Sequence, residues 1–216
     1  MTAVLAIDQS TSATKALIFD AQGQVLDKAS LEHQQYYPTP GWVEHDADEI
    51  YANTLATIET LIKRHPGQTF DFLSITNQRE TFVIFDRATG APLHRAIVWQ
   101  CRRGEPICQE LLAAGHGDTV QQLTGLKIDT YFPASKITHL LRQRPELKQR
   151  LEDGTALVST IDAYLVYRLT DAAVFATDHT NACRTLFYDI NALDWSDDLC
   201  ALFGVPRHAL PEIRES

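Results

Sequence analysis

The sequence predicts an α/β domain in which a mixed sheet begins with an antiparallel meander of three strands and is flanked by helices. Residues 4–7 form a short, wholly apolar run ending at Asp8, as is typical of a strand buried on both faces. Two more strand-like runs, Lys15–Phe19 and Gln24–Leu31, follow after short polar turns. A parallel crossover needs about a dozen residues or more, so these three strands must be antiparallel.

The segment after the meander predicts a long helix over Ala47–Arg64. Asp46 is the expected N-cap, and Glu49, three residues later, completes a capping box. Apolar residues recur at helical period along the segment, and residues 65–67, His-Pro-Gly, end it. A fourth strand, Phe72–Thr76, is predicted next.

Strands and helices then alternate through the rest of the chain. Strands are predicted at Phe82–Phe85 and Ala96–Trp99, on either side of the turn Asp86–Gly90. The helices are predicted at Glu105–Ala114, Thr119–Leu123, Ala134–Arg144 and Ile161–Leu169. A meander at the start argues against a Rossmann domain, because the βαβ units of that fold begin at once.

Charge and cysteine content exclude several classes of protein. Lys and Arg number 19 against 28 Asp and Glu in 216 residues, and the net charge of −9 would repel a nucleic acid. The four cysteines lack C-x-x-C spacing, and the eight histidines lack H-x-x-x-H or H-E-x-x-H spacing, so metal-centred hydrolysis is not expected. No leader or long apolar stretch is recognisable. We therefore expect a cytoplasmic protein that does not insert into membranes.

A polar turn between the first two strands carries the first candidate site. Residues 8–15 contain an acid, four hydroxyls and a cation. In such a turn Thr11 and Ser12 could donate to phosphate oxygens, Lys15 could supply positive charge, and Asp8 could hold Mg²⁺ through water. A polar hairpin without a ligand explains the same residues.

A second candidate site follows the strand Phe72–Thr76. Arg79 offers a fork of donors and Glu80 a pair of acceptors, and a hydroxylated substrate needs both kinds of group at fixed spacing. We expect Arg79 to compensate the charge of Glu80. The alternative is that the two side chains form a surface ion pair.

Two aromatic residues are candidates for an apolar wall beside a substrate. Trp99 stands at the end of a predicted strand, and Tyr131 adds a ring and a phenolic donor. Both residues could instead belong to the core.

Together these stretches resemble the FGGY family of carbohydrate kinases, and within it the glycerol kinases most closely. The resemblance covers essentially the whole chain. The motifs that carry it are Ala6-Ile7-Asp8-Gln9, residues 40–46 (Pro-Gly-Trp-Val-Glu-His-Asp), Ile75–Thr81, Ala96–Arg103, Thr124-Gly125-Leu126, Asp129–Phe132 and Thr177–Ala182.

The resemblance implies a ribonuclease-H-like, actin-like ATPase domain that binds ATP and Mg²⁺. The residues that match those enclosing the polyol in this family are Arg79, Glu80, Trp99 and Tyr131. Those that match the turn facing the ATP phosphates are Thr11, Ser12 and Lys15, and Asp8 matches the residue near magnesium. The catalytic base of the family lies beyond Ser216. We therefore expect residues 1–216 to be the N-terminal, substrate-binding domain, without the C-terminal domain and inactive alone.

The expected reaction is ATP-dependent phosphorylation of a polyol, first of all glycerol to glycerol 3-phosphate, by a full-length cytoplasmic homo-oligomer. Three positions depart from the glycerol kinase pattern: Ser10 replaces Gly, Lys15 replaces Arg, and residues 133–136 replace Ser-Gly-Thr-Lys. A side chain at position 10 would be strained at positive φ. The alternatives left open are a kinase for another polyol or a ketose, such as erythritol or xylulose, and a non-catalytic polyol-binding sensor module.

Overall fold

The computed structural model describes residues 3–216, which divide into two compact units. Of the described residues, the first unit contains 3–35 and 45–78, and the second contains 36–44 and 79–216. The chain passes between the units three times: within β4 (Gln35–Tyr36), within β5 (Glu44–His45), and between Gln78 and Arg79.

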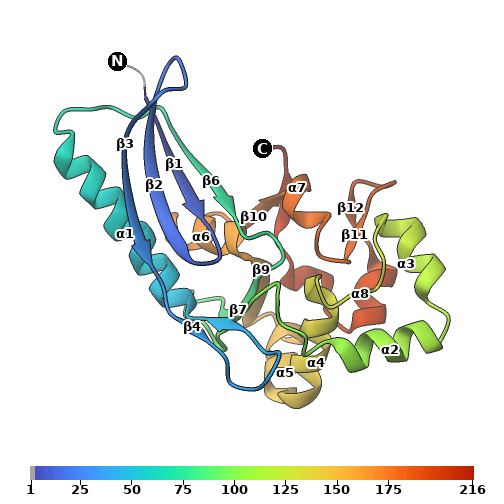
Figure 1. The fold of residues 1–216 in the computed structure, drawn as a ribbon. Helices are drawn as coiled ribbons and strands as arrows, with labels where there is room; N and C mark the ends of the chain where they lie inside the picture. The colour runs from blue at the N-terminus through green and yellow to red at the C-terminus, as the bar shows by residue number, and fades with distance from the viewer. Residues whose placement is uncertain (1–2) are drawn as a thin grey trace. The chain divides into compact units, whose positions relative to one another are not determined.

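A four-stranded mixed sheet forms the first unit (Figure 1). Its strands, in the order β3-β2-β1-β6, are β3 (Val25–Glu32), β2 (Ala13–Asp20), β1 (Ala3–Gln9) and β6 (Phe72–Asn77). The pairs β1–β2 and β2–β3 are antiparallel, which confirms the predicted meander, and β6 is parallel to β1. Alternate residues of β1 are buried, because side chains of a strand point to opposite faces of the sheet.

Helix α1 (Ala47–Arg64) contacts β2 and β3 and has the predicted bounds. The side chain of Asp46 accepts the N–H groups of Asp48 and Glu49, as an N-cap does. Leu61 of α1 shares a core with Leu5, Ile7 and Ile18 of the sheet.

The second unit contains the antiparallel strands β8 (Ala96–Ile97), β7 (Phe82–Asp86) and β9 (Ala156–Thr160). These continue a five-stranded sheet of order β4-β5-β8-β7-β9. β9 was not predicted, although its residues are apolar or small and all of them are buried.

The helices of the second unit are α2 (Glu105–Ala113), α3 (Gly117–Thr124), α4 (Pro133–Gln143), α5 (Pro145–Glu152), α6 (Ile161–Leu169), α7 (His179–Ala182) and α8 (Asp197–Phe203). Four of them, α2, α3, α4 and α6, confirm predicted helices. α5 was not predicted: Pro145 not only stops α4 but also starts α5, because proline is well tolerated in the first turn of a helix.

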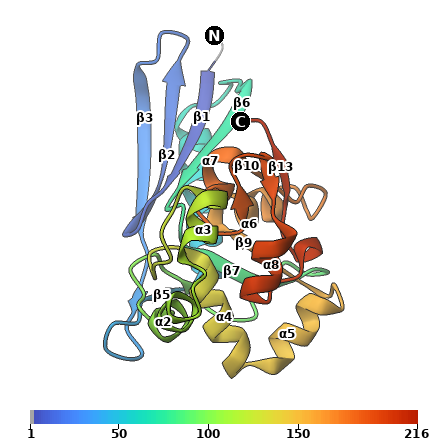
Figure 2. The same ribbon diagram turned by 90° about the vertical axis from the view of Figure 1, so that its right-hand side faces the viewer.

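Two small sheets complete this unit. β10 (Ala176–Asp178) and β13 (Glu212–Arg214) lie side by side and are parallel (Figure 2). β11 (Tyr188–Asp189) pairs with β12 (Asp194–Trp195). Among the helices of residues 3–216, none is long and apolar enough to cross a lipid bilayer.

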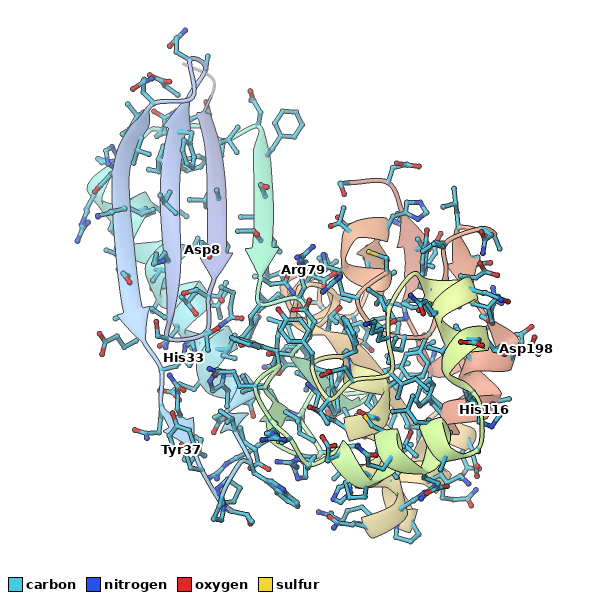
Figure 3. The ribbon with its side chains drawn as sticks, turned by 45° about the vertical axis from the view of Figure 1, so that its right-hand side comes forward. Asp8, His33, Tyr37, Arg79, His116 and Asp198 are labelled. Atoms are coloured by element: carbon cyan, nitrogen blue, oxygen red, sulfur yellow. The ribbon has the colours of Figure 1, made fainter. Side chains whose placement is uncertain are left out.

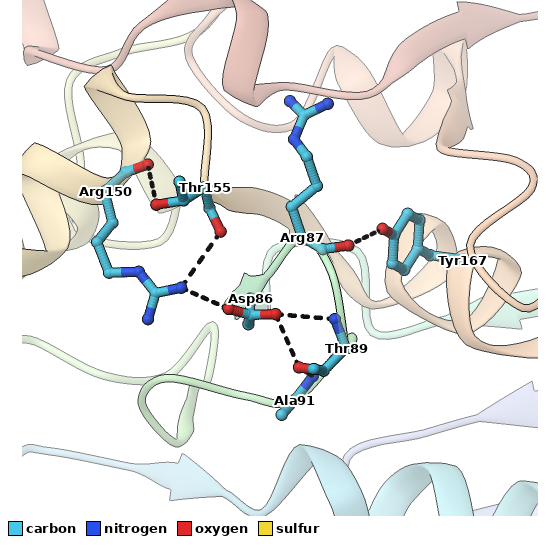
Figure 4. Close-up of polar contacts among 7 residues, drawn as sticks. All are labelled: Asp86, Arg87, Thr89, Ala91, Arg150, Thr155 and Tyr167. Carbon is cyan, nitrogen blue, oxygen red and sulfur yellow. Dashed lines mark hydrogen bonds and ion pairs between the residues drawn. The ribbon is translucent and has the colours of Figure 1, made fainter.

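The turn after β7 is held by a polar cluster (Figure 4). The Asp86 carboxylate accepts the N–H and the hydroxyl of Thr89, both at 2.8 Å, and pairs with Arg150 of α5. These bonds lower the pKa of Asp86. The cluster holds the C-terminal end of β7, at Asp86, in place. The N-terminal end of the same strand, Phe82, lies two residues after Glu80.

Candidate functional site

The β1–β2 turn, residues 8–15, carries a cross-strand ion pair. Asp8 and Lys15 are directly opposite in the ladder, and the Lys15 Nζ lies 2.9 Å from Asp8 Oδ2. Both side chains remain partly exposed, at 37% for Asp8 and 42% for Lys15. A pair so open to solvent contributes at most about 1 kcal/mol to stability, so both groups remain available to a ligand.

Ser10 forms two hydrogen bonds across this turn. Its N–H and its hydroxyl both donate to the carbonyl of Ala13, at 3.0 and 2.8 Å. Among the described residues, Ser10 is not one of those with positive φ. The strain expected for a serine at this position is therefore not present, and Thr11 and Ser12 remain at the outer part of the turn.

His33, which follows β3, holds the turn from the side (Figure 3). Its ring Nε2 lies 2.9 Å from the carbonyl oxygen of Thr11, and its backbone N–H donates to the carbonyl of Ser12. Nε2 must carry the proton, since a carbonyl only accepts. The other ring nitrogen, Nδ1, is buried without a hydrogen-bond partner in the part of the chain described. Burial lowers the pKa of His33, and the ring therefore stays neutral at pH 7.

His45 packs edge-on against His33, with ring centroids 4.6 Å apart. Its Nδ1 lies 3.3 Å from the amide nitrogen of Gln78, which also donates to the side-chain oxygen of Gln9 at 3.0 Å. Burial, followed by the proximity of His33, lowers the pKa of His45 to about 3. A neutral, buried network therefore supports the turn.

The turn fits a magnesium ion that is bound mainly by phosphates and water. Within residues 3–216, no cluster of three or more His, Cys, Asp or Glu side chains could hold a metal ion. Mg²⁺ is usually bound through one or two carboxylates together with waters and substrate phosphates. The partly exposed carboxylate of Asp8 is a donor of this kind.

The second candidate site, which we call the acceptor site, comprises Arg79, Glu80, Trp99 and Tyr131. Arg79 is exposed, and Glu80 is 5% exposed. Arg184, not Arg79, compensates Glu80: Arg184 Nε lies 2.8 Å from Glu80 Oε1. The expectation that Arg79 balances Glu80 was wrong. A buried carboxylate needs a close cation, and Arg184 provides it from 104 residues away in the sequence.

Two rings form the aromatic part of the acceptor site. The ring centroids of Trp99 and Tyr131 are 5.4 Å apart, and the rings are tilted by 56°. Trp99 is half-buried and packs against the core of the unit, whereas Tyr131 is 39% exposed. The guanidinium of Arg184 lies 5.9 Å from the Tyr131 centroid and 5.0 Å from that of Phe132. Arg184 thus contacts both the carboxylate and the aromatic part of the site.

Lys136 of α4 forms hydrogen bonds to the main chain of both ring-bearing residues, Trp99 and Tyr131. Its side chain is fully buried, and its ammonium group donates to the carbonyl oxygens of Val98, Trp99 and Tyr131 at 3.2–3.3 Å. Burial lowers the pKa of Lys136 to about 7.

Arg184 and Lys136 were not among the predicted site residues. Arg184 follows the motif Thr177–Ala182 by two residues, and that proximity was the available signal. Lys136 is four residues before Leu140, on the apolar face of α4, and a lysine on such a face indicates burial.

Residues 3–216 match the model of the FGGY family of carbohydrate kinases, N-terminal domain. A glycerol kinase of Stenotrophomonas maltophilia (strain R551-3) is 46% identical over 217 residues, which cover 99% of this chain and 43% of that protein. The chain therefore spans less than half the length of this curated relative.

Solved structures agree with the sequence matches. The crystal structure of Plasmodium falciparum glycerol kinase with ADP has a TM-score of 0.95 and 40% identity, over 99% of this chain and 43% of that one. A ligand-bound xylulose kinase from Lactobacillus acidophilus has a TM-score of 0.89 at 21% identity, over 99% of this chain and 42% of that one, which bears on the fold alone. The predicted actin-like ATPase fold is confirmed. The chain belongs to the FGGY family of carbohydrate kinases and corresponds to the N-terminal domain of that family.

Proposed function

We propose that the complete protein carrying this chain transfers the γ-phosphoryl group of ATP to a terminal hydroxyl of glycerol, giving glycerol 3-phosphate. The observation that carries the proposal is the acceptor site. A buried carboxylate, Glu80, is held by Arg184 beside two partly exposed rings, Trp99 and Tyr131. The sequence similarity to glycerol kinases over 99% of the chain supports the choice of substrate.

The roles in the acceptor site follow from the chemistry of each side chain. Arg184 engages Glu80 Oε1, and the second carboxylate oxygen, Oε2, accepts a substrate hydroxyl in this proposal. Arg79, exposed and charged, donates to another hydroxyl oxygen. The two rings contact the C–H groups of the polyol, and the phenol of Tyr131 offers a further donor.

The β1–β2 turn binds the phosphates of ATP in this proposal. Thr11 and Ser12 donate to phosphate oxygens, and Lys15 neutralises part of their charge. Asp8 would hold Mg²⁺, which would supply positive charge beside the phosphates. Catalysis then rests mainly on holding the acceptor hydroxyl about 3–3.5 Å from the γ-phosphorus in a site that excludes water.

We further propose that residues 1–216 are the substrate-binding domain of this enzyme. In this proposal a second domain, outside these residues, supplies the catalytic base and the adenine pocket, and the full-length protein is a cytoplasmic homo-oligomer. Light scattering coupled to size-exclusion chromatography tests the oligomer: a monomeric mass for the complete protein would exclude it.

Product identification tests the function. The complete protein is incubated with Mg-ATP and glycerol, and ³¹P NMR follows the products. We expect the resonance of glycerol 3-phosphate to grow in step with ADP. Omission of glycerol is the control for ATP hydrolysis. A protein that binds glycerol in calorimetry but forms no phosphorylated product would instead be a polyol-binding sensor.

A further inference from the structure

A buried lysine that is bonded to the main chain of two acceptor-site residues has no part in the roles proposed above. Lys136 lies in the second turn of α4, and its side chain is 0% exposed. Lysine is among the residues least often fully buried, because removing an ammonium group from water is costly unless every donor is satisfied. Its burial in a well-packed unit therefore calls for a specific set of partners.

Those partners are three main-chain carbonyl groups. Lys136 Nζ is 3.3 Å from the oxygen of Val98, 3.2 Å from that of Trp99 and 3.2 Å from that of Tyr131. An ammonium group has three N–H donors, so each donor has one acceptor. All three acceptors are main-chain oxygens. Lys136 therefore holds the backbone in position and does not bond to a particular side chain.

The three carbonyls belong to two separate segments, and each segment carries one ring of the acceptor site. Residues 98–99 directly follow β8 (Ala96–Ile97), and Tyr131 lies just before α4. The main chain of Trp99 is also held from its other side, because its N–H donates to the hydroxyl of Thr81 at 3.2 Å. Tyr131 has a corresponding bond from its N–H to the carboxylate of Asp129 at 2.7 Å.

We infer that Lys136 is a positioning residue of the acceptor site, whose ammonium group joins the main chains of Trp99 and Tyr131 and so fixes the spacing of the two rings that contact the polyol. The inference rests on the proposed function, because it assigns the rings to substrate. It predicts that loss of the ammonium group weakens polyol binding without removing any group that contacts substrate or phosphate.

The protonation of Lys136 then affects the acceptor site as well. The charged groups and thiols that act on it are Cys101, Glu80, Arg103 and Cys108. Burial is the largest cause of the lowered pKa of Lys136, about 7; Glu80 and the two thiols oppose the shift, and Arg103 adds to it. The neutral amine has only two donors, so one carbonyl loses its partner as pH rises above 7.

The test compares Lys136→Met with a matched exposed control, Lys127→Met, in the complete protein. Methionine keeps most of the side-chain length but removes the donor to the three main-chain carbonyls, so some loss of stability is expected. We expect Lys136→Met to raise the KM for glycerol roughly tenfold, with kcat changed by less than about threefold, and urea unfolding shows that the variant is folded under the assay conditions. Lys127→Met, which is exposed, keeps the KM of the wild type.

A second variant keeps the inference testable if Lys136→Met does not fold. Lys136→Gln retains two N–H donors but does not titrate. We expect an intermediate rise in KM that stays constant between pH 7 and 9, whereas the KM of the wild type rises over the same range. A glycerol KM equal to that of the wild type in either folded variant would overturn the positioning role. A wild type that does not phosphorylate glycerol would instead overturn the proposed function.

Discussion

Arg184 Nε lies 2.8 Å from Oε1 of Glu80, a carboxylate that is 5% exposed. The pair joins the segment after β6 to the segment after α7 (His179–Ala182). Arg184, and not the neighbouring Arg79, supplies the cation that pairs with this carboxylate. We therefore expect substitutions of the two arginines to have different effects.

The first prediction concerns the stability of this pair. Arg184→Met leaves the buried carboxylate of Glu80 without its cation and should lower the free energy of unfolding by about 2–4 kcal/mol, somewhat less than for a fully enclosed pair because Arg184 is 24% exposed. Urea unfolding measures the change. The double variant Glu80→Gln, Arg184→Met should recover part of the loss, and a double variant as unstable as the single one would contradict the pairing.

Arg79→Ala, unlike Arg184→Met, should weaken glycerol binding while leaving the free energy of unfolding almost unchanged. Arg79 is exposed, so its removal should change the free energy of unfolding by less than about 0.5 kcal/mol. Loss of a charge-assisted bond worth roughly 1.5–3 kcal/mol should weaken glycerol binding about tenfold or more. Calorimetry measures the affinity, with Arg102→Ala, another exposed arginine, as the control. An unchanged affinity in Arg79→Ala would remove Arg79 from the acceptor site.

Substitutions at Tyr131 separate its ring from its hydroxyl. Tyr131→Phe keeps the ring next to Trp99 and removes one donor, which should raise the KM for glycerol about two- to tenfold, as expected for a bond of roughly 0.5–1.5 kcal/mol. Tyr131→Ala removes both groups and should raise KM further. Steady-state kinetics with the complete protein measure both variants. Equal KM values for Tyr131→Phe and Tyr131→Ala would show that the ring makes no contribution.

The pH dependence of stability should follow from His45. Its pKa is about 3 in the folded chain and about 6.5 when unfolded. Between these values the unfolded chain binds a proton that the folded chain does not, so stability falls as pH decreases below 6.5. The slope from this one group approaches about 1.4 kcal/mol per pH unit. Protonation of His33, whose pKa is also lowered, adds to the same trend.

Urea unfolding at pH 7.0 and 5.0 tests this prediction. His45→Gln should lose less stability than the wild type between the two pH values. His116→Gln, at the start of α3, is the matched control and should keep the slope of the wild type. The same slope in His45→Gln and in the wild type would contradict the assignment.

Local patterns predicted the elements whose signals are contained in a short segment. The meander followed from apolar runs and short turns, and α1 from its N-cap and helical period. Helix α5 was not predicted because a proline such as Pro145 can either end one helix or begin the next. No local pattern distinguishes the two.

The candidate site was predicted only in part, because the contacts that hold its residues are not local in the sequence. Trp99 ends an apolar run and Glu80 lies in the polar stretch that follows another, which are positions typical of functional groups. The partners that fix them are distant or atypical. Arg184 is 104 residues from Glu80, and the acceptors of Lys136 are main-chain carbonyls, which leave no trace in residue type. Contacts of this kind depend on the tertiary fold.

The most direct test of the proposed function is the specificity of the complete protein for its acceptor. Values of kcat/KM are measured with Mg-ATP for glycerol, erythritol and D-xylulose in an assay coupled to ADP release. We expect the highest kcat/KM for glycerol, by about tenfold or more, because the longer acceptors must fit between Glu80 and the two rings. A higher kcat/KM for erythritol or xylulose, or no ATP-dependent turnover with any of the three, would contradict the account.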